Sequence, residues 1–219
     1  MDIKDNTVPG ENQMATSTDL SFLGNENAKM KVLVVGNSIT RHAPLASIGW
    51  NNDWGMAASA PEKDYVHRLF AKLTESGKDV FMRVRQVSLW EISLKVEDIL
   101  SRYDGERNFD ADVVVFRLGE NVPEADKPLF KDAFRKFANH ICPSGEGVFV
   151  SCFWKNEMID NVIKDIAEER GDVFLDGFLA EDESNMALGL YEHSGVAMHP
   201  GDKGMEAIAD LIFGALKDK

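Results

Sequence analysis

Three short stretches of the chain carry side chains that could perform acyl transfer by a serine. They are GNSIT at 36–40, GEN at 119–121 and HP at 199–200. Acyl transfer needs an exposed hydroxyl, a base that takes its proton, and hydrogen-bond donors for the developing oxyanion. Ser38, His199 and the amide of Asn121 are the residue types that would supply these three functions.

Each stretch also has a structural interpretation without chemistry. A serine between a strand and a helix commonly caps the helix, and Gly36 would then only give the turn its backbone freedom. An asparagine after a strand often forms a turn, and a histidine before a terminal helix is usually a surface residue. The three stretches together, each after a predicted strand, favour catalysis. A helix that begins directly after Ser38 would add positive potential at its hydroxyl.

The elements that must position these residues alternate between strands and helices. Apolar runs predict five strands, at 31–35, 80–87, 112–118, 147–152 and 173–176. Apolar stripes with helical spacing predict helices at 64–76, 128–141, 157–169 and 203–216, with Asp202 capping the last. This alternation indicates a doubly wound sheet of five parallel strands with right-handed connections.

Ligands of an open parallel sheet bind at the carboxyl ends of its strands, and polar or aromatic residues follow the predicted strands of this chain. All four tryptophans, including Trp50 and Trp54 in the long connection 41–63, lie in such segments. We therefore expect an aromatic rim that stacks on sugar rings, although these tryptophans could equally pack the connection onto the body. The candidate substrate contacts are Arg41, Trp90, Glu91 and Trp154.

The composition argues against a nucleic-acid partner. The 219 residues carry a net charge of −13, and no basic cluster interrupts this acidity, whereas phosphate binding requires a basic face. No apolar run approaches the length of a membrane span, so we expect no membrane partner. No ligand-spaced cluster predicts a metal and no glycine-rich loop predicts a nucleotide cofactor, while the oligomeric state is left open.

Residues 1–29 are polar and lack the basic start and apolar run of a secretion signal. They predict a flexible N-terminal arm, with Leu20, Phe22 and Leu23 touching the surface, followed by one domain at 30–219. The expected location is cytoplasmic on the sequence as given, or periplasmic or secreted if a signal has been trimmed.

The three stretches resemble conserved blocks of the SGNH hydrolases, also called GDSL-type esterases. GNSIT at 36–40 is similar to the first block, G-D-S-x-T, with Asn37 in place of the aspartate. GEN at 119–121 matches the third block, G-x-N, and HP at 199–200 matches the end of the fifth. The resemblance implies a flavodoxin-like three-layer α/β/α sandwich and ester hydrolysis without a cofactor. It also implies Ser38 as nucleophile, His199 as general base, and Asn121 with Gly119 at the oxyanion site.

Two positions depart from the pattern of that family. The family usually has an aspartate three residues before the histidine, where this chain has Val196. A backbone carbonyl is the expected substitute that orients the imidazole, with the carboxylate of Glu192 as second choice. The second block also lacks its usual glycine, because the segment 86–93 at the end of the second predicted strand, QVSLWEIS, contains none.

Two functions from different classes therefore follow from the sequence. The first is a serine esterase that removes an acyl group, with acetyl as a candidate, from a small or carbohydrate substrate. The alternative is a non-catalytic protein that binds a ligand or carbohydrate on the same fold, which the missing aspartate makes plausible. A flavin or nucleotide binder is disfavoured by the absence of a phosphate-binding glycine pattern after the first strand.

Overall fold

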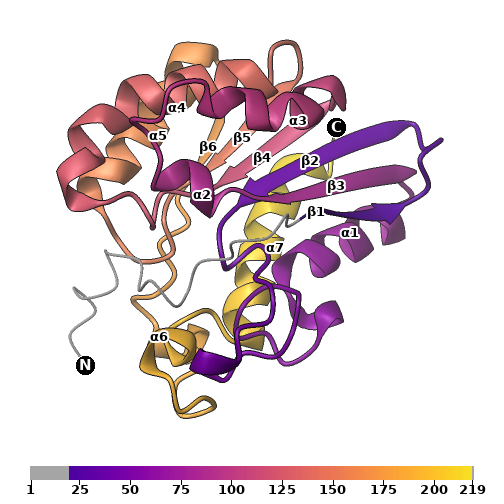
Figure 1. Cartoon of the computed structure of the whole chain (residues 1–219). Coiled ribbons are helices and arrows are strands. Elements are labelled where there is room, and N and C mark those ends of the chain that lie inside the picture. The colour runs from indigo at the N-terminus through magenta and orange to yellow at the C-terminus, as the bar shows by residue number, and fades with distance from the viewer. Residues whose placement is uncertain (1–19, 219) are drawn as a thin grey trace.

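A mostly parallel sheet forms the centre of the protein (Figure 1). The computed structural model describes residues 20–218. Its strands, in chain order, are β1 (Leu20–Gly24), β2 (Met30–Gly36), β3 (Val80–Gln86), β4 (Val113–Arg117), β5 (Glu146–Val150) and β6 (Val173–Leu175). The spatial order is β1-β3-β2-β4-β5-β6, in which β2 to β6 are parallel and β1 is an antiparallel edge strand.

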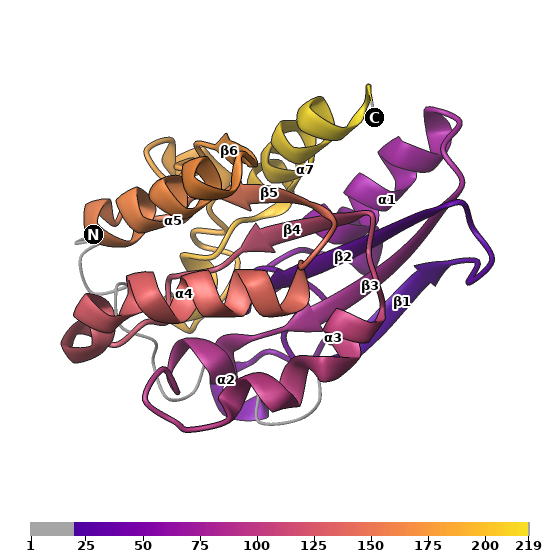
Figure 2. The same cartoon turned by 90° about the horizontal axis from the view of Figure 1, so that it is seen from above.

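Helices cover both faces of this sheet (Figure 2). On one face α1 (Tyr65–Glu75) packs against α7 (Asp202–Leu216), and on the other α4 (Lys127–Ile141) packs against α5 (Glu157–Arg170). The connections contain the short helices α2 (Ser88–Glu91), α3 (Asp104–Asn108) and α6 (Ser194–Ala197). The predicted three-layer α/β/α sandwich is confirmed.

Strand β2 is apolar along its length because helices cover it on both faces. Val32 and Val34 pack into the core under α1 and α7, whereas Leu33 and Val35 pack into the core under α4 and α5. All four side chains are fully buried, because successive residues of a strand point to opposite faces. The run at 31–35 is therefore continuous in apolar residues, and its carboxyl end delivers Ser38 to the edge of the sheet.

Two sequence expectations need correction. The sheet has a sixth strand, because Leu20–Gly24, which we assigned to the flexible arm, pairs with β3 in antiparallel register. Residues 1–19 of that arm lie outside the described residues. Asp202 does not cap α7, since its carboxylate accepts hydrogen bonds from the N–H and hydroxyl of Ser59. Among residues 20–218, no helix has both the length and the apolar character needed to cross a bilayer.

Candidate active site

The turn after β2 displays Ser38. The backbone N–H groups of Thr40 and Arg41 both donate to the carbonyl of Asn37, at 2.9 and 3.1 Å. A side chain at Gly36 would overlap the Thr40 hydroxyl and a neighbouring backbone carbonyl, so this tight turn requires glycine. No helix follows the turn directly, since α1 begins only at Tyr65. The expected positive potential of a helix amino end at Ser38 is therefore wrong.

Ser38 and His199 meet at hydrogen-bond distance across the carboxyl edge of the sheet. Ser38 Oγ lies 2.8 Å from His199 Nε2, although the two residues are 161 positions apart in the chain. Both are buried, at 6% and 2% exposure. Burial is the main cause that lowers the pKa of His199 to about 3, and the nearby His42 and Arg117 lower it further. The ring is therefore neutral at ordinary pH and can accept the hydroxyl proton.

A backbone carbonyl orients the His199 ring, as the sequence predicted. His199 Nδ1 lies 2.6 Å from the carbonyl oxygen of Gly195, and this acceptor fixes the proton on Nδ1 and leaves Nε2 free to accept. The carbonyl is available because α6 is short: the N–H of His199, which would continue the helix, donates to Val196 instead. Val196 is fully buried against the connection that carries Trp50.

The second stretch, which holds Gly119 and Asn121, is connected to the turn that carries Ser38 through hydrogen bonds to Glu91. Glu91 Oε1 accepts a hydrogen bond from the backbone N–H of Gly119 at 2.5 Å, and Oε2 accepts from Asn121 Nδ2 at 2.6 Å. The same Asn121 amide also lies 3.2 Å from Ser88 Oγ. Burial, followed by the negative charge of Glu120, raises the pKa of Glu91 to about 7, against the effect of its N–H donors.

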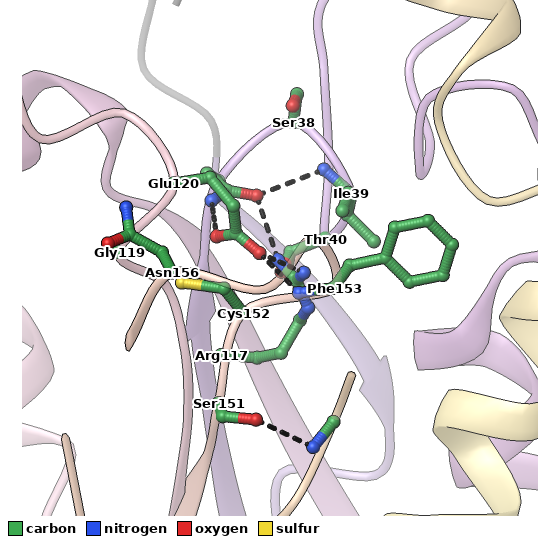
Figure 3. Close-up of polar contacts among 12 residues, drawn as sticks. Ser38, Ile39, Thr40, Arg117, Gly119, Glu120, Ser151, Cys152, Phe153 and Asn156 are labelled. Carbon is green, nitrogen blue, oxygen red and sulfur yellow. Dashed lines mark hydrogen bonds and ion pairs between the residues drawn. The ribbon is translucent and has the colours of Figure 1, made fainter. Parts of the chain in front are cut away.

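Asn37 lies at the centre of a buried polar network next to Ser38. Figure 3 shows the paired side chains of Arg117 and Glu120 below the turn that carries Ser38. Asn37 Oδ1 accepts from Arg117 at 3.1 Å, and its Nδ2 donates to Glu120 Oε2 at 2.5 Å and to Glu91 Oε1 at 3.4 Å. Glu120 forms an ion pair with Arg117 and accepts the backbone N–H of Phe153. An asparagine fits this place because it both donates and accepts, whereas an aspartate would face two carboxylates. This explains the departure of the chain from G-D-S-x-T.

Burial excludes two of the four predicted substrate contacts, Trp90 and Glu91. Trp90 is 1% exposed and stacks on Phe137 at 4.3 Å between ring centroids, so it belongs to the core under α4. Glu91 is fully buried. Neither side chain has a surface with which to touch a substrate, and both predictions are wrong. Trp154 lies edge-on to His199 at 5.3 Å, and Arg41 forms an ion pair with Asp53.

The expected aromatic rim is wrong as well. Trp50 is fully buried, Trp154 is 6% exposed and Trp54 is partly buried, so the tryptophans pack the connections instead of presenting flat faces to solvent. Trp50, Met56 and Val196 form a small apolar cluster that attaches the 41–63 connection to the α6 segment. The alternative interpretation, in which these tryptophans hold the connection onto the body, is the correct one.

Sequence reasoning missed Arg117 and did not assign a role to Glu120, Ser88 or Gly195. The signal for Arg117 was present, because a charged residue at the end of the buried strand β4 must find a partner. Arg117 is 1% exposed and finds two, Glu120 and Asn37. Within residues 20–218, no group of three or more His, Cys, Asp or Glu side chains is placed to hold a metal ion.

No family model and no curated protein matches the chain. Solved structures do. LAE5, an α/β hydrolase enzyme from the metagenome of Lake Arreo, Spain, is similar with a TM-score of 0.59 and 16% identity, over 86% of this chain and 95% of its own. Axe2, an acetylxylan esterase from Geobacillus stearothermophilus, is similar with a TM-score of 0.58 and 16% identity, over 85% of this chain and 94% of its own.

The solved Axe2 structures include catalytic mutants in which a serine, an aspartate or a histidine is replaced by alanine. At 16% identity, these likenesses show that this chain shares the fold of these two enzymes. The fold agrees with the three-layer sandwich described above. Because one fold can host many reactions, the chemistry of this chain is inferred from its own Ser38, His199 and Asn121.

Proposed function

We propose that the protein is a serine ester hydrolase of the SGNH type. The observation that carries this proposal is the hydrogen bond between Ser38 Oγ and His199 Nε2 at 2.8 Å, with the ring held by the carbonyl of Gly195. A nucleophile, a neutral base and an acceptor that sets the tautomer of the base are the parts that serine acyl transfer requires. The esterases among the similar structures support the same reaction class.

Hydrolysis in this site proceeds in two halves. Ser38 Oγ attacks the ester carbonyl while His199 Nε2 takes its proton, and the same nitrogen then protonates the leaving alcohol. The acyl group remains on Ser38. A water molecule, deprotonated by His199, attacks this acyl-enzyme, and the proton returns to Ser38 as the carboxylic acid leaves. The Gly195 carbonyl stabilises the imidazolium that forms in each half.

The oxyanion of each tetrahedral intermediate needs donors beside Ser38. We assign these to the backbone N–H of Ser38 and the side-chain amide of Asn121, with Gly119 setting the turn at its positive φ of 126°. Asn121 Nδ2 makes a short contact to Glu91 and a longer one, 3.2 Å, to Ser88 Oγ. The longer contact is the one that an oxyanion would replace.

Asn121→Ala is expected to lower kcat by about 10²–10³-fold with little change in KM, because an oxyanion donor acts on the transition state. Steady-state hydrolysis of p-nitrophenyl acetate measures both constants. Asn139→Ala, which removes an exposed asparagine near the carboxyl end of α4, serves as the control and should keep kcat. A rise in KM alone would make Asn121 a substrate contact and remove it from the oxyanion site.

Glu192→Gln is expected to keep most of the activity. Glu192 is exposed, and the Nδ1 proton of His199 already has the Gly195 carbonyl as its acceptor at 2.6 Å. A catalytic carboxylate in the same place would matter by about 10⁴-fold in the serine-protease template. A loss of that size in Glu192→Gln would replace the backbone-oriented pair with a displaced triad.

The substrate class is an ester of a small molecule or carbohydrate, with acetyl as the proposed acyl group. The acetylxylan esterases among the similar structures support this choice. The tryptophans do not support it, because they are buried and present no aromatic rim on which a sugar ring could stack. Release of acetate from an acetylated xylo-oligosaccharide, compared with a butyrate ester of p-nitrophenol, tests the acyl length and the alcohol together. A protein that hydrolyses no ester would favour the alternative of a non-catalytic binding protein.

A further inference from the structure

Glu91 connects three segments that meet beside the proposed catalytic pair. Its Oε1 accepts from the backbone N–H of Gly119 at 2.5 Å and from Asn37 Nδ2 at 3.4 Å, while its Oε2 accepts from Asn121 Nδ2 at 2.6 Å. Asn37 directly precedes Ser38, and Asn121 is the proposed oxyanion donor. Glu91 itself is fully buried, so it acts on a substrate only through these residues.

We propose that Glu91 is a positioning residue whose carboxylate holds the Asn121 amide and the Ser38 turn in the relative placement that oxyanion stabilisation requires. This inference rests on the proposed function. Asn121 stabilises an oxyanion only if its amide points at the place where the charge develops, and a misplacement of about 1 Å can cost 10²-fold in rate. The short Glu91–Asn121 contact is the one that fixes this amide.

A carboxylate is needed here because every partner of Glu91 is an N–H donor. An ionised glutamate accepts at both oxygens, whereas a glutamine would turn its own NH₂ group against one of the donors. Protonation of Glu91 has the same effect, since the new O–H would face Gly119 or Asn121. We call the hydrogen bonds from Asn37, Gly119 and Asn121 to Glu91 the brace, and all of them form only when Glu91 is ionised.

The charged groups around Glu91 come from several elements. Glu120 opposes its ionisation from the segment after β4, and Arg117 in β4 neutralises Glu120 through an ion pair. Tyr103, from the 3-10 turn Ile99–Tyr103, also lies within electrostatic reach of Glu91. His199 stays neutral throughout the neutral range because its pKa is lowered to about 3, so its ionisation is separate from that of Glu91.

The test compares Glu91→Gln with Glu106→Gln in hydrolysis of p-nitrophenyl acetate by the full chain. Glu106 is an equally buried glutamate, but it pairs with Arg83 and lies outside the site. We expect Glu91→Gln to lower kcat by roughly 10²-fold with KM within about threefold, and Glu106→Gln to keep kcat. Equal kcat losses in both variants, or a change confined to KM in Glu91→Gln, would overturn the proposal.

The pH profile separates positioning from a purely structural role. In the wild type, kcat should rise with pH through one ionisation between about pH 5 and pH 9, and Glu91→Gln should lack this step. A wild-type kcat that is flat or falls over this range, or a step that persists in Glu91→Gln, would contradict the brace.

A measurement on the wild type keeps the proposal testable if Glu91→Gln does not fold or if no ester is hydrolysed. The NMR resonances of the Gly119 amide proton and the Asn121 side-chain amide should titrate together, with one shared midpoint, because both groups donate to the same carboxylate. Independent midpoints, or no titration at either group, would overturn the brace. The proposed function fails separately, by the absence of ester hydrolysis in the wild type.

Discussion

Ser38→Ala is expected to abolish ester hydrolysis, with kcat at least about 10⁴-fold below that of the wild type. Among residues 20–218, no other hydroxyl is placed to take over, because His199 Nε2 is directed at Ser38 Oγ at 2.8 Å. The melting temperature should change little, since the hydroxyl contributes one hydrogen bond in a turn whose backbone contacts remain. Initial rates with p-nitrophenyl acetate and a thermal melt of each protein are the two measurements.

Ser47→Ala provides the matched control for this experiment. Ser47 is exposed in the connection that follows the turn carrying Ser38, and the loss of its hydroxyl should leave both rate and stability unchanged. A fully active Ser38→Ala protein would end the assignment of Ser38 as nucleophile, even if Asn121→Ala behaved as expected.

Asn37→Asp is expected to destabilise the fold by about 3–5 kcal/mol near pH 8, even though it restores the residue typical of the first block. The change removes the Nδ2 donor from Glu91 and Glu120 and puts a third carboxylate beside them, with Arg117 as the cation that pairs with Glu120. Arg117 would then be shared between Glu120 and the new carboxylate, and buried charges that are not fully compensated are among the most costly defects in a protein interior. Chemical denaturation gives the free energy of unfolding.

The pH dependence of this loss is part of the prediction. Burial and the neighbouring carboxylates raise the pKa of the new Asp side chain, so it is protonated more readily in the folded than in the unfolded state. The stability contributed by that proton is lost as pH rises, and the deficit of Asn37→Asp should therefore be smaller near pH 5 than near pH 8. Asn51→Asp, at an exposed asparagine, should stay within about 0.5 kcal/mol of the wild type at both values. Equal effects of the two substitutions would contradict the buried network.

The layers and the meeting of Ser38 with His199 could be predicted because local patterns determine them. Continuous apolar runs such as 31–35 identify strands covered on both faces, and the carboxyl ends of parallel strands share one edge. The edge strand at Leu20–Gly24 was not predicted, because it is short, half-exposed and lies in a polar segment. Its pairing with β3 depends on a contact more than fifty residues away.

The details of the site needed coordinates because they depend on hydrogen-bond direction and burial. The sequence predicted that a backbone carbonyl would orient His199, and the geometry identifies it as that of Gly195. It could not predict that Trp90 turns into the core or that Glu91 points at Asn121, since a residue type after a strand does not specify its direction. The presence of asparagine at position 37 is explained only by its hydrogen bonds to Arg117, Glu91 and Glu120, which the sequence does not reveal.

The most direct test of the account is covalent labelling of the nucleophile. The wild-type chain is incubated with a fluorophosphonate, which reacts with serines activated by a neighbouring base, and the modified peptide is identified by mass spectrometry. We expect one adduct, on the peptide that contains Ser38, and its absence from Ser38→Ala; His199→Ala should label much more slowly. No adduct on the wild type, or an adduct on a different residue, would contradict the claim that Ser38 is an activated nucleophile.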